Sequence, residues 1–106
     1  MPKPSPVPGE IWIIDMGLAG KVRPCVALTG LPRDNELDLV TIILHTTSLR
    51  QNRWELAIPK PYLKEGAFHL QQIHSAPLPR LLRKLGELTT AEYESVRKRL
   101  VERLGL

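Results

Sequence analysis

The chain has 106 residues, long enough for one hydrophobic core and too short for two ordinary domains. Hydrophobic residues make up 42% and charged residues 25%, which matches globular usage and argues against a disordered or fibrous chain. The excess of 15 Lys+Arg over 11 Asp+Glu gives a formal charge of +4 and favours an anionic partner such as nucleic acid.

The first eight residues alternate proline with small or basic residues, a pattern that resists both helix and sheet. Residues 1–8 are therefore predicted to form an extended, mobile arm before a single domain at 9–106. Residues 9–15 carry apolar side chains on both alternating faces, which predicts a strand buried on both sides. Residues 17–20 (Gly-Leu-Ala-Gly) supply the permissive backbone for a reversal, and 21–29 are predicted to return as a second strand.

Branched residues dominate residues 37–45, which predicts a central strand that ends at the hydroxyl run 46–48 (Thr-Thr-Ser). A fourth strand is predicted over residues 52–58, where apolar and polar residues alternate before two prolines. One short helical turn is expected at residues 62–66, and a fifth strand at residues 67–74.

The composition changes after residue 75, where prolines introduce a basic stretch. Residues 80–85 are predicted to form a short helical piece closed by Gly86 as a C-terminal cap. Thr89 and Glu92 have capping-box spacing, which predicts the start of a last helix. Its apolar stripe is expected to cover the core with Tyr93, Val96, Leu100 and Leu104.

About five strands followed by a terminal helix predict a mainly β fold. The expected architecture is a small, strongly bent sheet or open barrel, with the helix covering one end. Such a sheet leaves a concave face and an edge. A small polar set is expected to converge at one end of the sheet, and it consists of Arg23, Thr46, Thr47, Ser48 and Gln72.

Arg23 is the most informative member of this polar set. Pro24 biases it towards extended geometry, and its planar fork of donors suits phosphate oxygens. From these residues alone, an ordinary surface arginine beside an edge-strand proline is the more common alternative.

The sequence contains no zinc-ligand spacing, phosphate-binding glycine loop or dinucleotide fingerprint, so no metal or cofactor is expected. A single cysteine, Cys25, excludes an internal disulfide, and no apolar run reaches the roughly 20 residues that cross a bilayer. We therefore expect a cytoplasmic protein. The histidines His45, His69 and His74 lie in or near apolar strands, where a structural role is more common, and they stay candidates for proton transfer.

Five short motifs, in their order and spacing, resemble the MazF/PemK/Kid family of toxins. They are Gly-Glu-Ile-Trp at 9–12, Lys-Val-Arg-Pro at 21–24, Thr-Thr-Ser at 46–48, Gln-Ile at 72–73 and Arg-Lys-Leu-Gly-Glu-Leu-Thr at 83–89. The match runs from about residue 9 to residue 104. The resemblance implies an SH3-like barrel with C-terminal helical packing and a homodimer. It also implies the toxin of a type II toxin-antitoxin system, an endoribonuclease that cleaves single-stranded RNA until a cognate antitoxin blocks it.

The resemblance also implies roles for individual residues. Arg23 matches the catalytic arginine of the family's Arg-Pro motif, and Thr47 matches the threonine of its Thr-Ser motif. The family uses no metal, takes the 2′-hydroxyl of the RNA as nucleophile and leaves a cyclic phosphate. A fixed guanidinium and a hydroxyl donor suit the charge that develops on phosphoryl oxygens. Since arginine scarcely deprotonates, His45 and His69 are the candidates for removing the 2′ proton.

Further side chains are candidates for substrate binding, with solvated surface charge as the alternative for the cations. They are Lys21, Thr46, Ser48, Arg50, Arg53 and Gln72. Three aromatic side chains are candidates for stacking RNA bases, although core or dimer packing is the more common role: Trp12, Trp54 and Phe68. Two departures from the family are the short loop at 17–20 and Gln71, which stands where many members have an aspartate.

A second hypothesis from another class is a non-catalytic toxin or binding module on the same kind of barrel. A gyrase poison of the CcdB type and an RNA-binding regulator are both examples. The two hypotheses differ in one respect that can be tested, because a non-catalytic protein should act without Arg23.

Overall fold

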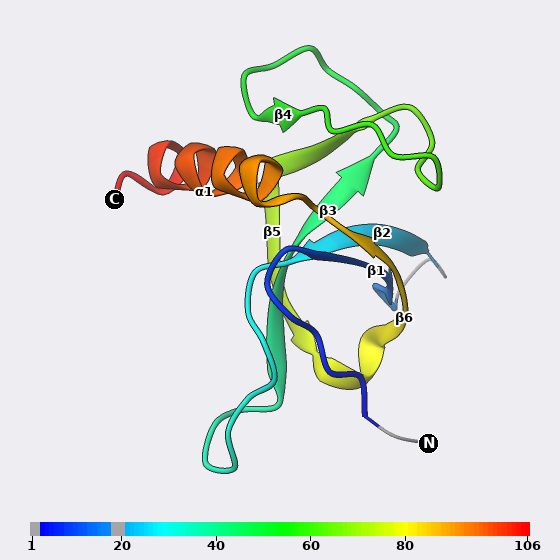
Figure 1. The fold of residues 1–106 in the computed structure, drawn as a ribbon, viewed down its shortest axis with the longest axis vertical. Helices are drawn as coiled ribbons and strands as arrows, with labels where there is room; N and C mark the ends of the chain where they lie inside the picture. Colours follow the sequence, from blue (N-terminus) through cyan, green and yellow to red (C-terminus); the bar gives the residue numbers. More distant parts are fainter. Residues whose placement is uncertain (1–2, 18–20) are drawn as a thin grey trace.

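The computed structural model describes residues 3–17 and 21–106, and in these residues six strands form one sheet beside a C-terminal helix (Figure 1). Neighbouring strands are antiparallel, in the order β4-β5-β3-β2-β1-β6. The elements are β1 (Glu10–Asp15), β2 (Val22–Ala27), β3 (Leu39–Thr46), β4 (Glu55–Leu56), β5 (Ala67–Pro77), the 3-10 helix η2 (Leu78–Arg80), β6 (Leu81–Glu87) and α1 (Thr90–Leu104).

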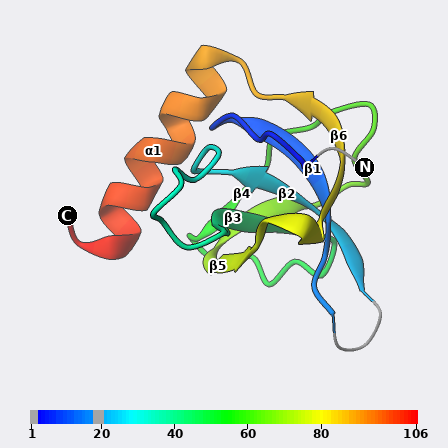
Figure 2. The ribbon, with the colours of Figure 1, turned by 90° about the horizontal axis from the view of Figure 1, so that it is seen from below.

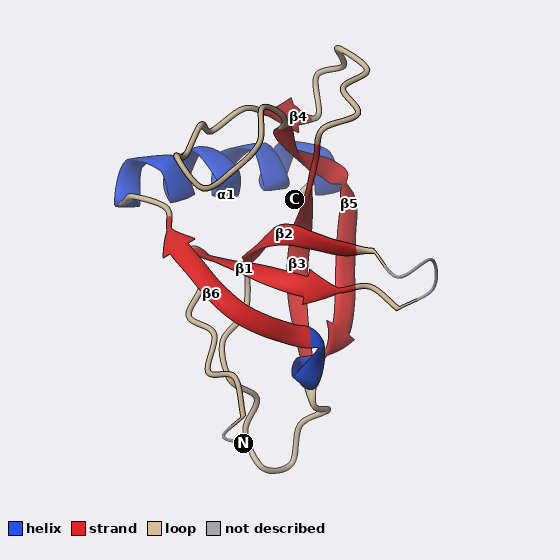
Figure 3. Ribbon diagram, turned by 90° about the vertical axis from the view of Figure 1, so that its right-hand side faces the viewer, coloured by secondary structure: helices blue, strands red, loops and turns tan. Residues whose placement is uncertain are grey.

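The predicted mainly β fold with a C-terminal helix is confirmed. The sheet bends strongly, so that β6 curves across one end of it (Figure 3), and α1 lies to one side of the strands (Figure 2). Among the described residues β4 and β6 pair with one neighbour each, so the barrel is open along these two edges. The reversal predicted at residues 17–20 falls, apart from Gly17, outside the described part of the chain.

The helical piece predicted at residues 80–85 is wrong, because Arg80 ends the 3-10 helix η2 and residues 81–85 belong to strand β6. It pairs with β1 over its length, and Gly86, expected as a helix cap, lies opposite Ile11. The backbone groups of this stretch find partners on β1, so the tertiary neighbour overrides the local helical pattern. This strand raises the number of strands from the expected five to six.

The fourth strand is far shorter than the predicted 52–58, because side chains take up the backbone of the preceding residues. The Glu55 carboxylate accepts the N–H groups of Arg50, Gln51 and Asn52 at 2.6, 2.8 and 3.3 Å, and the Asn52 side chain accepts that of Trp54 at 2.9 Å. Gln51 adopts a positive φ of 63° to make this turn. Local side-chain bonds thus replace the strand ladder over residues 50–53, and the first backbone bond to β5 is made by the Trp54 carbonyl, which accepts the N–H of Leu70 at 2.8 Å.

Residues 62–66 do not form the expected helical turn. The segment runs through turns and bends, and the N–H of Leu63 donates to the carbonyl of Lys60 at 3.0 Å. A Cβ placed on Gly66 would collide with the carbonyl oxygen of Thr46 and come within 2.9 Å of the His45 ring. The absence of a side chain at Gly66 therefore lets this segment lie against the end of β3.

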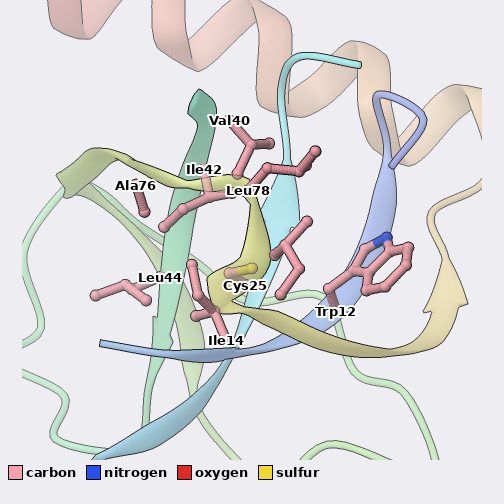
Figure 4. Packing of buried hydrophobic residues seen from close by; sticks show 9 residues of the cluster. Trp12, Ile14, Cys25, Val40, Ile42, Leu44, Ala76 and Leu78 are labelled. Carbon is pink, nitrogen blue, oxygen red and sulfur yellow. The ribbon is translucent and has the colours of Figure 1, made fainter. Parts of the chain in front are cut away.

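Strand β1 is buried on both faces, as predicted. Trp12 and Ile14 face a cluster that includes Cys25, shown in Figure 4, whereas Ile11 faces a second cluster on the helix side. Burial raises the pKa of the Cys25 thiol to about 12, so the side chain stays a neutral, packed thiol.

The predicted start of the last helix is confirmed. Thr89 accepts the N–H of Glu92 at 3.1 Å, and the Glu92 carboxylate accepts that of Thr89 at 2.8 Å, which makes a complete capping box. Val96 is buried in the second cluster. Leu104 is 55% exposed, so the apolar stripe ends before this residue, contrary to the prediction. No helix of the described residues is both long and apolar enough to cross a membrane.

The carboxylate of Glu10 joins β1 to the segment before it and to β6. It accepts the N–H of Val7 at 2.8 Å and the indole N–H of Trp12 at 3.1 Å, and it lies 2.9 Å from Lys84 Nζ. Burial by itself raises the pKa of Glu10, but the hydrogen bonds from Lys84, Val7 and Trp12 outweigh burial and hold the pKa below its usual range. Glu10 is therefore ionised at neutral pH.

Replacing Glu10 with Gln should lower the free energy of unfolding at pH 7 by about 1–3 kcal/mol, because buried donors lose a charged acceptor. A carboxyl whose pKa is lowered on folding stabilises the fold above its unfolded value of about 4.5, and this contribution is lost as the pH falls further. The difference between the two proteins in urea denaturation should therefore shrink below pH 4.5. The exposed Glu65→Gln is the matched control, and an equal effect of both substitutions would contradict the prediction.

Candidate functional site

A cavity of about 680 Å³ opens at the end of the sheet where β2 begins and β3 ends. Its lining includes the whole polar set expected to converge, together with two further candidates. These residues are Lys21, Arg23, His45, Thr46, Thr47, Ser48 and Gln72. The antiparallel pairing of β2 with β3 explains why these side chains lie together, because it places the first residues of β2 beside the last residues of β3.

The guanidinium of Arg23 is held by the end of β3. Its Nε and Nη2 donate to the carbonyl oxygen of His45 at 3.2 and 2.8 Å. Arg23 is half-buried, and desolvation lowers its pKa, although an arginine remains charged at any physiological pH. Two of the five N–H donors are used within the described structure, so three are left for an anionic ligand.

His45 lies almost fully buried beside this arginine, with 4% of its surface exposed. Its ring packs edge-on against Phe68, with the centroids 5.1 Å apart and the planes at 76°. Burial and, second, the charge of Arg23 hold the pKa of His45 below its usual range. The imidazole is therefore neutral at pH 7 and able to accept a proton.

The hydroxyl run at the end of β3 is organised by one local bond. Thr46 is buried, and its Oγ1 accepts the N–H of Ser48 at 3.0 Å. Thr47, between them, is exposed, and its hydroxyl makes no hydrogen bond to another described residue. The turn thus engages the first hydroxyl internally and leaves the second available to a ligand.

Gln72 reaches the cavity through an irregularity of β5. Ile43 pairs with Ile73, and His45 pairs with Phe68, so that one β3 residue stands opposite the four β5 residues 69–72. Such an excess bends the strand and redirects its side chains. The neighbouring Gln71 is exposed and accepts the side-chain N–H of Asn52 at 3.3 Å.

The cavity carries positive charge without an acidic counterpart. Its lining contains Lys21, Arg23 and Lys64, and no Asp or Glu of the described chain belongs to it. Cationic clefts of this kind attract phosphate groups. Within residues 3–17 and 21–106, no three His, Cys, Asp or Glu side chains are grouped to hold a metal ion.

Four of the candidate residues do not line the cavity, and one of them, His74, is exposed on β5. Arg50 lies on the loop held by Glu55, and the Arg53 guanidinium stacks 4.4 Å from the centre of the Trp54 ring. His69 is buried elsewhere on β5. Its Nδ1 accepts the N–H of Gln71 at 3.1 Å, and its Nε2 lies 4.0 Å from the Glu55 carboxylate.

The aromatic side chains considered for base stacking are also placed away from the cavity. Trp12 and Phe68 are core residues, which agrees with the alternative of core packing. Among the polar residues of the cavity, sequence reasoning missed Tyr62 and Lys64. Their only signal is their position in a polar segment between two strands, where a tyrosine is expected to be exposed.

Comparison with known protein families gives one match. The family model described as PemK-like, MazF-like toxin of type II toxin-antitoxin system matches residues 7–104. No curated protein sequence matches the chain.

Solved structures show the same fold. An endoribonuclease in complex with its cognate antitoxin from Mycobacterial species has a TM-score of 0.77 at 23% identity, covering 95% of this chain and 96% of that chain. A MazE-MazF structure (Form-II) from Deinococcus radiodurans has a TM-score of 0.79 at 19% identity, covering 97% and 98%. The Mycobacterium tuberculosis toxin MazF-mt6 has a TM-score of 0.75 at 20% identity, covering 92% and 97%.

Replacing Arg23 with Met should raise the pKa of His45, because one of the two causes that lower it is removed. The pKa should stay below the usual value of 6.5, since burial of the ring remains. Titration of the imidazole protons by NMR measures both values, with a His45→Gln variant to assign the signals. An unchanged pKa in Arg23→Met would show that the guanidinium does not act on this ring.

Proposed function

The chain belongs to the PemK-like, MazF-like toxin family of type II toxin-antitoxin systems, and from this we propose that it is an endoribonuclease acting on single-stranded RNA. One observation carries the proposal. A guanidinium fixed at the end of β3 and a free hydroxyl at Thr47 line one cationic cavity that contains no acidic side chain of the described residues. This combination suits a phosphodiester better than a neutral or cationic substrate.

In the proposed reaction the 2′-hydroxyl of the RNA attacks the adjacent phosphorus. A bond forms between the 2′-oxygen and phosphorus, and the bond to the 5′-oxygen of the next nucleotide breaks. The products are a 2′,3′-cyclic phosphate and a 5′-hydroxyl, whose oxygen takes its proton from water as it leaves. In the transition state, negative charge develops on the phosphoryl oxygens. The remaining donors of Arg23 and the hydroxyl of Thr47 would stabilise this charge.

The proton of the 2′-hydroxyl needs an acceptor, and we assign this role to His45. This histidine lines the cavity, whereas His69 does not. Because the pKa of His45 is held below its usual range, the ring is available as a neutral base at pH 7. Protonation of the ring at lower pH should therefore suppress the reaction.

The other lining residues are proposed to bind the substrate. Lys21 offers charge to the RNA backbone, and Thr46, Ser48 and Gln72 offer polar contacts. Arg50 and Arg53 lie outside the lining and could contact only RNA that extends beyond the cavity. We further propose that a cognate antitoxin covers the cationic cavity with an acidic segment, in the cytoplasm where its RNA target is found.

Arg23→Ala should reduce cleavage of a mixed-sequence single-stranded RNA by about 100-fold or more, because one preorganised donor to a developing charge contributes that much. The assay is run in excess chelator, and the fragments are examined for cyclic-phosphate ends. Thr47→Val should reduce the rate as well. Arg33→Ala is the matched control, since Arg33 is exposed on the loop at the opposite end of β3.

An Arg23→Ala protein that is folded and cleaves like the wild type would refute the proposed mechanism. If the folded wild type leaves RNA intact, the endoribonuclease proposal fails. The non-catalytic hypothesis is then tested with gyrase, whose supercoiling activity a CcdB-type poison should inhibit even without Arg23.

A homodimer is also proposed, and the exposed large apolar side chains of this small domain support it. Examples are Leu37, Leu82 and Leu104, each more than half exposed at 77%, 54% and 55%. Static light scattering at micromolar concentration should give twice the chain mass of 12.0 kDa. A mass of one chain would contradict the dimer.

A further inference from the structure

Tyr62 is an aromatic residue of the cavity that the proposed reaction does not use. It lies on the segment between β4 and β5, and it lines the same cavity as Arg23. The side chain is 39% exposed, whereas the other aromatic ring of the lining, His45, is 4% exposed. A partly exposed tyrosine offers an apolar ring and a polar hydroxyl to a ligand, which is why tyrosine is enriched at interfaces.

Strand β6 of the sheet, together with the loop that carries Tyr62, fixes the position of the tyrosine ring. A Cβ on Gly86 would collide with the Tyr62 hydroxyl and come within 2.6 and 2.9 Å of the ring atoms Cζ and Cε1. The phenol end therefore packs directly on the backbone of β6. Gly86 itself pairs with Ile11 in the ladder between β6 and β1, which gives the ring a rigid support.

This arrangement explains the glycine in β6. Glycine weakens a strand interior, and it often marks a site where another group approaches closely. The backbone at Gly86 does not adopt a positive φ, so its conformation is open to any residue. The requirement for glycine at this position is therefore steric, and Tyr62 is what imposes it.

The surroundings of the ring match single-stranded nucleic acid. Lys64 lies two residues further along the same segment and lines the same cavity, and Arg23 supplies a fixed charge. Proteins that bind single strands combine cations for the backbone with aromatic rings on which the bases stack. A ring that is already held in place loses little conformational freedom when a base stacks on it.

We propose that Tyr62 is a stacking platform for one unpaired base of the RNA, next to the phosphate that Arg23 binds. This inference rests on the proposed function, which supplies the substrate class. Tyr62 would then contribute to binding and to the choice of substrate, while Arg23 and Thr47 act on the phosphoryl group.

The test measures binding without cleavage. The probe is a short, fluorescein-labelled, mixed-sequence RNA with 2′-O-methyl groups, which lacks the nucleophile. Tyr62→Ala should weaken its binding roughly 5- to 100-fold, the range expected from loss of one stacked base. Tyr62→Phe keeps the ring and should retain most of the affinity. An abasic deoxyribose-phosphate oligomer of equal length should bind Tyr62→Ala and the wild type equally.

Two further variants test whether binding needs the Tyr62 ring to be held in place on β6, beyond being present in the chain. Gly86→Ala leaves Tyr62 in the chain but pushes its ring off the support, so binding should weaken as it does in Tyr62→Ala. In the double variant the second substitution should add little, because the two act through one contact. Gly30→Ala, on the loop between β2 and β3, is the matched control, and thermal unfolding of each variant verifies folding.

The inference is overturned if Tyr62→Ala binds the RNA like the wild type, or if it loses the RNA and the abasic oligomer to the same extent. Failure of the endoribonuclease proposal gives a different result in the cleavage and binding assays. In that case the wild type leaves unmodified RNA uncut, while binding of the 2′-O-methyl probe still depends on Tyr62.

Discussion

The bond between the Arg23 guanidinium and the carbonyl oxygen of His45 determines the geometry of the candidate site. It joins the start of β2 to the end of β3, and it fixes a charged group that would otherwise sample many conformations. Burial lowers the pKa of the His45 imidazole, and the same contact brings a permanent positive charge close to the ring that lowers the pKa further. One interaction thus sets the position of the cation and adds to the burial that keeps the neighbouring imidazole neutral.

The cavity depends on the places where the sheet departs from regular pairing. The excess of residues in β5 opposite β3 turns Gln72 into the cavity, and Gly66 allows the segment at 62–66 to approach the end of β3. The regular parts of β1, β2 and β3 bury the two core clusters instead. Regular pairing therefore supplies stability, and irregular pairing supplies a concave surface with polar side chains.

The proposals divide the recognition of RNA between charge and stacking. Arg23, Lys21 and Lys64 offer charge to any phosphate backbone, so they attract nucleic acid without reading its bases. A supported aromatic ring such as Tyr62 responds to the presence of an unpaired base. An acidic segment of an antitoxin would compete with RNA for the same cations. RNA binding and inhibition by the antitoxin would therefore both depend on the positive charge of the cavity.

The sequence by itself determined the elements whose signals are local. The double-faced burial of β1 follows from consecutive apolar residues, and the start of α1 follows from the capping box at Thr89. Arg23 became a candidate through the five motifs taken together, since its motif with Pro24 alone favours an ordinary surface arginine. Only the tertiary structure decided that residues 81–87 form a strand on β1 and that Tyr62 packs on Gly86 in the cavity. It also decided that His45 lines the cavity while His69 does not. These outcomes depend on partners distant in sequence, and a backbone or a ring that gains such a partner is no longer governed by its neighbours along the chain.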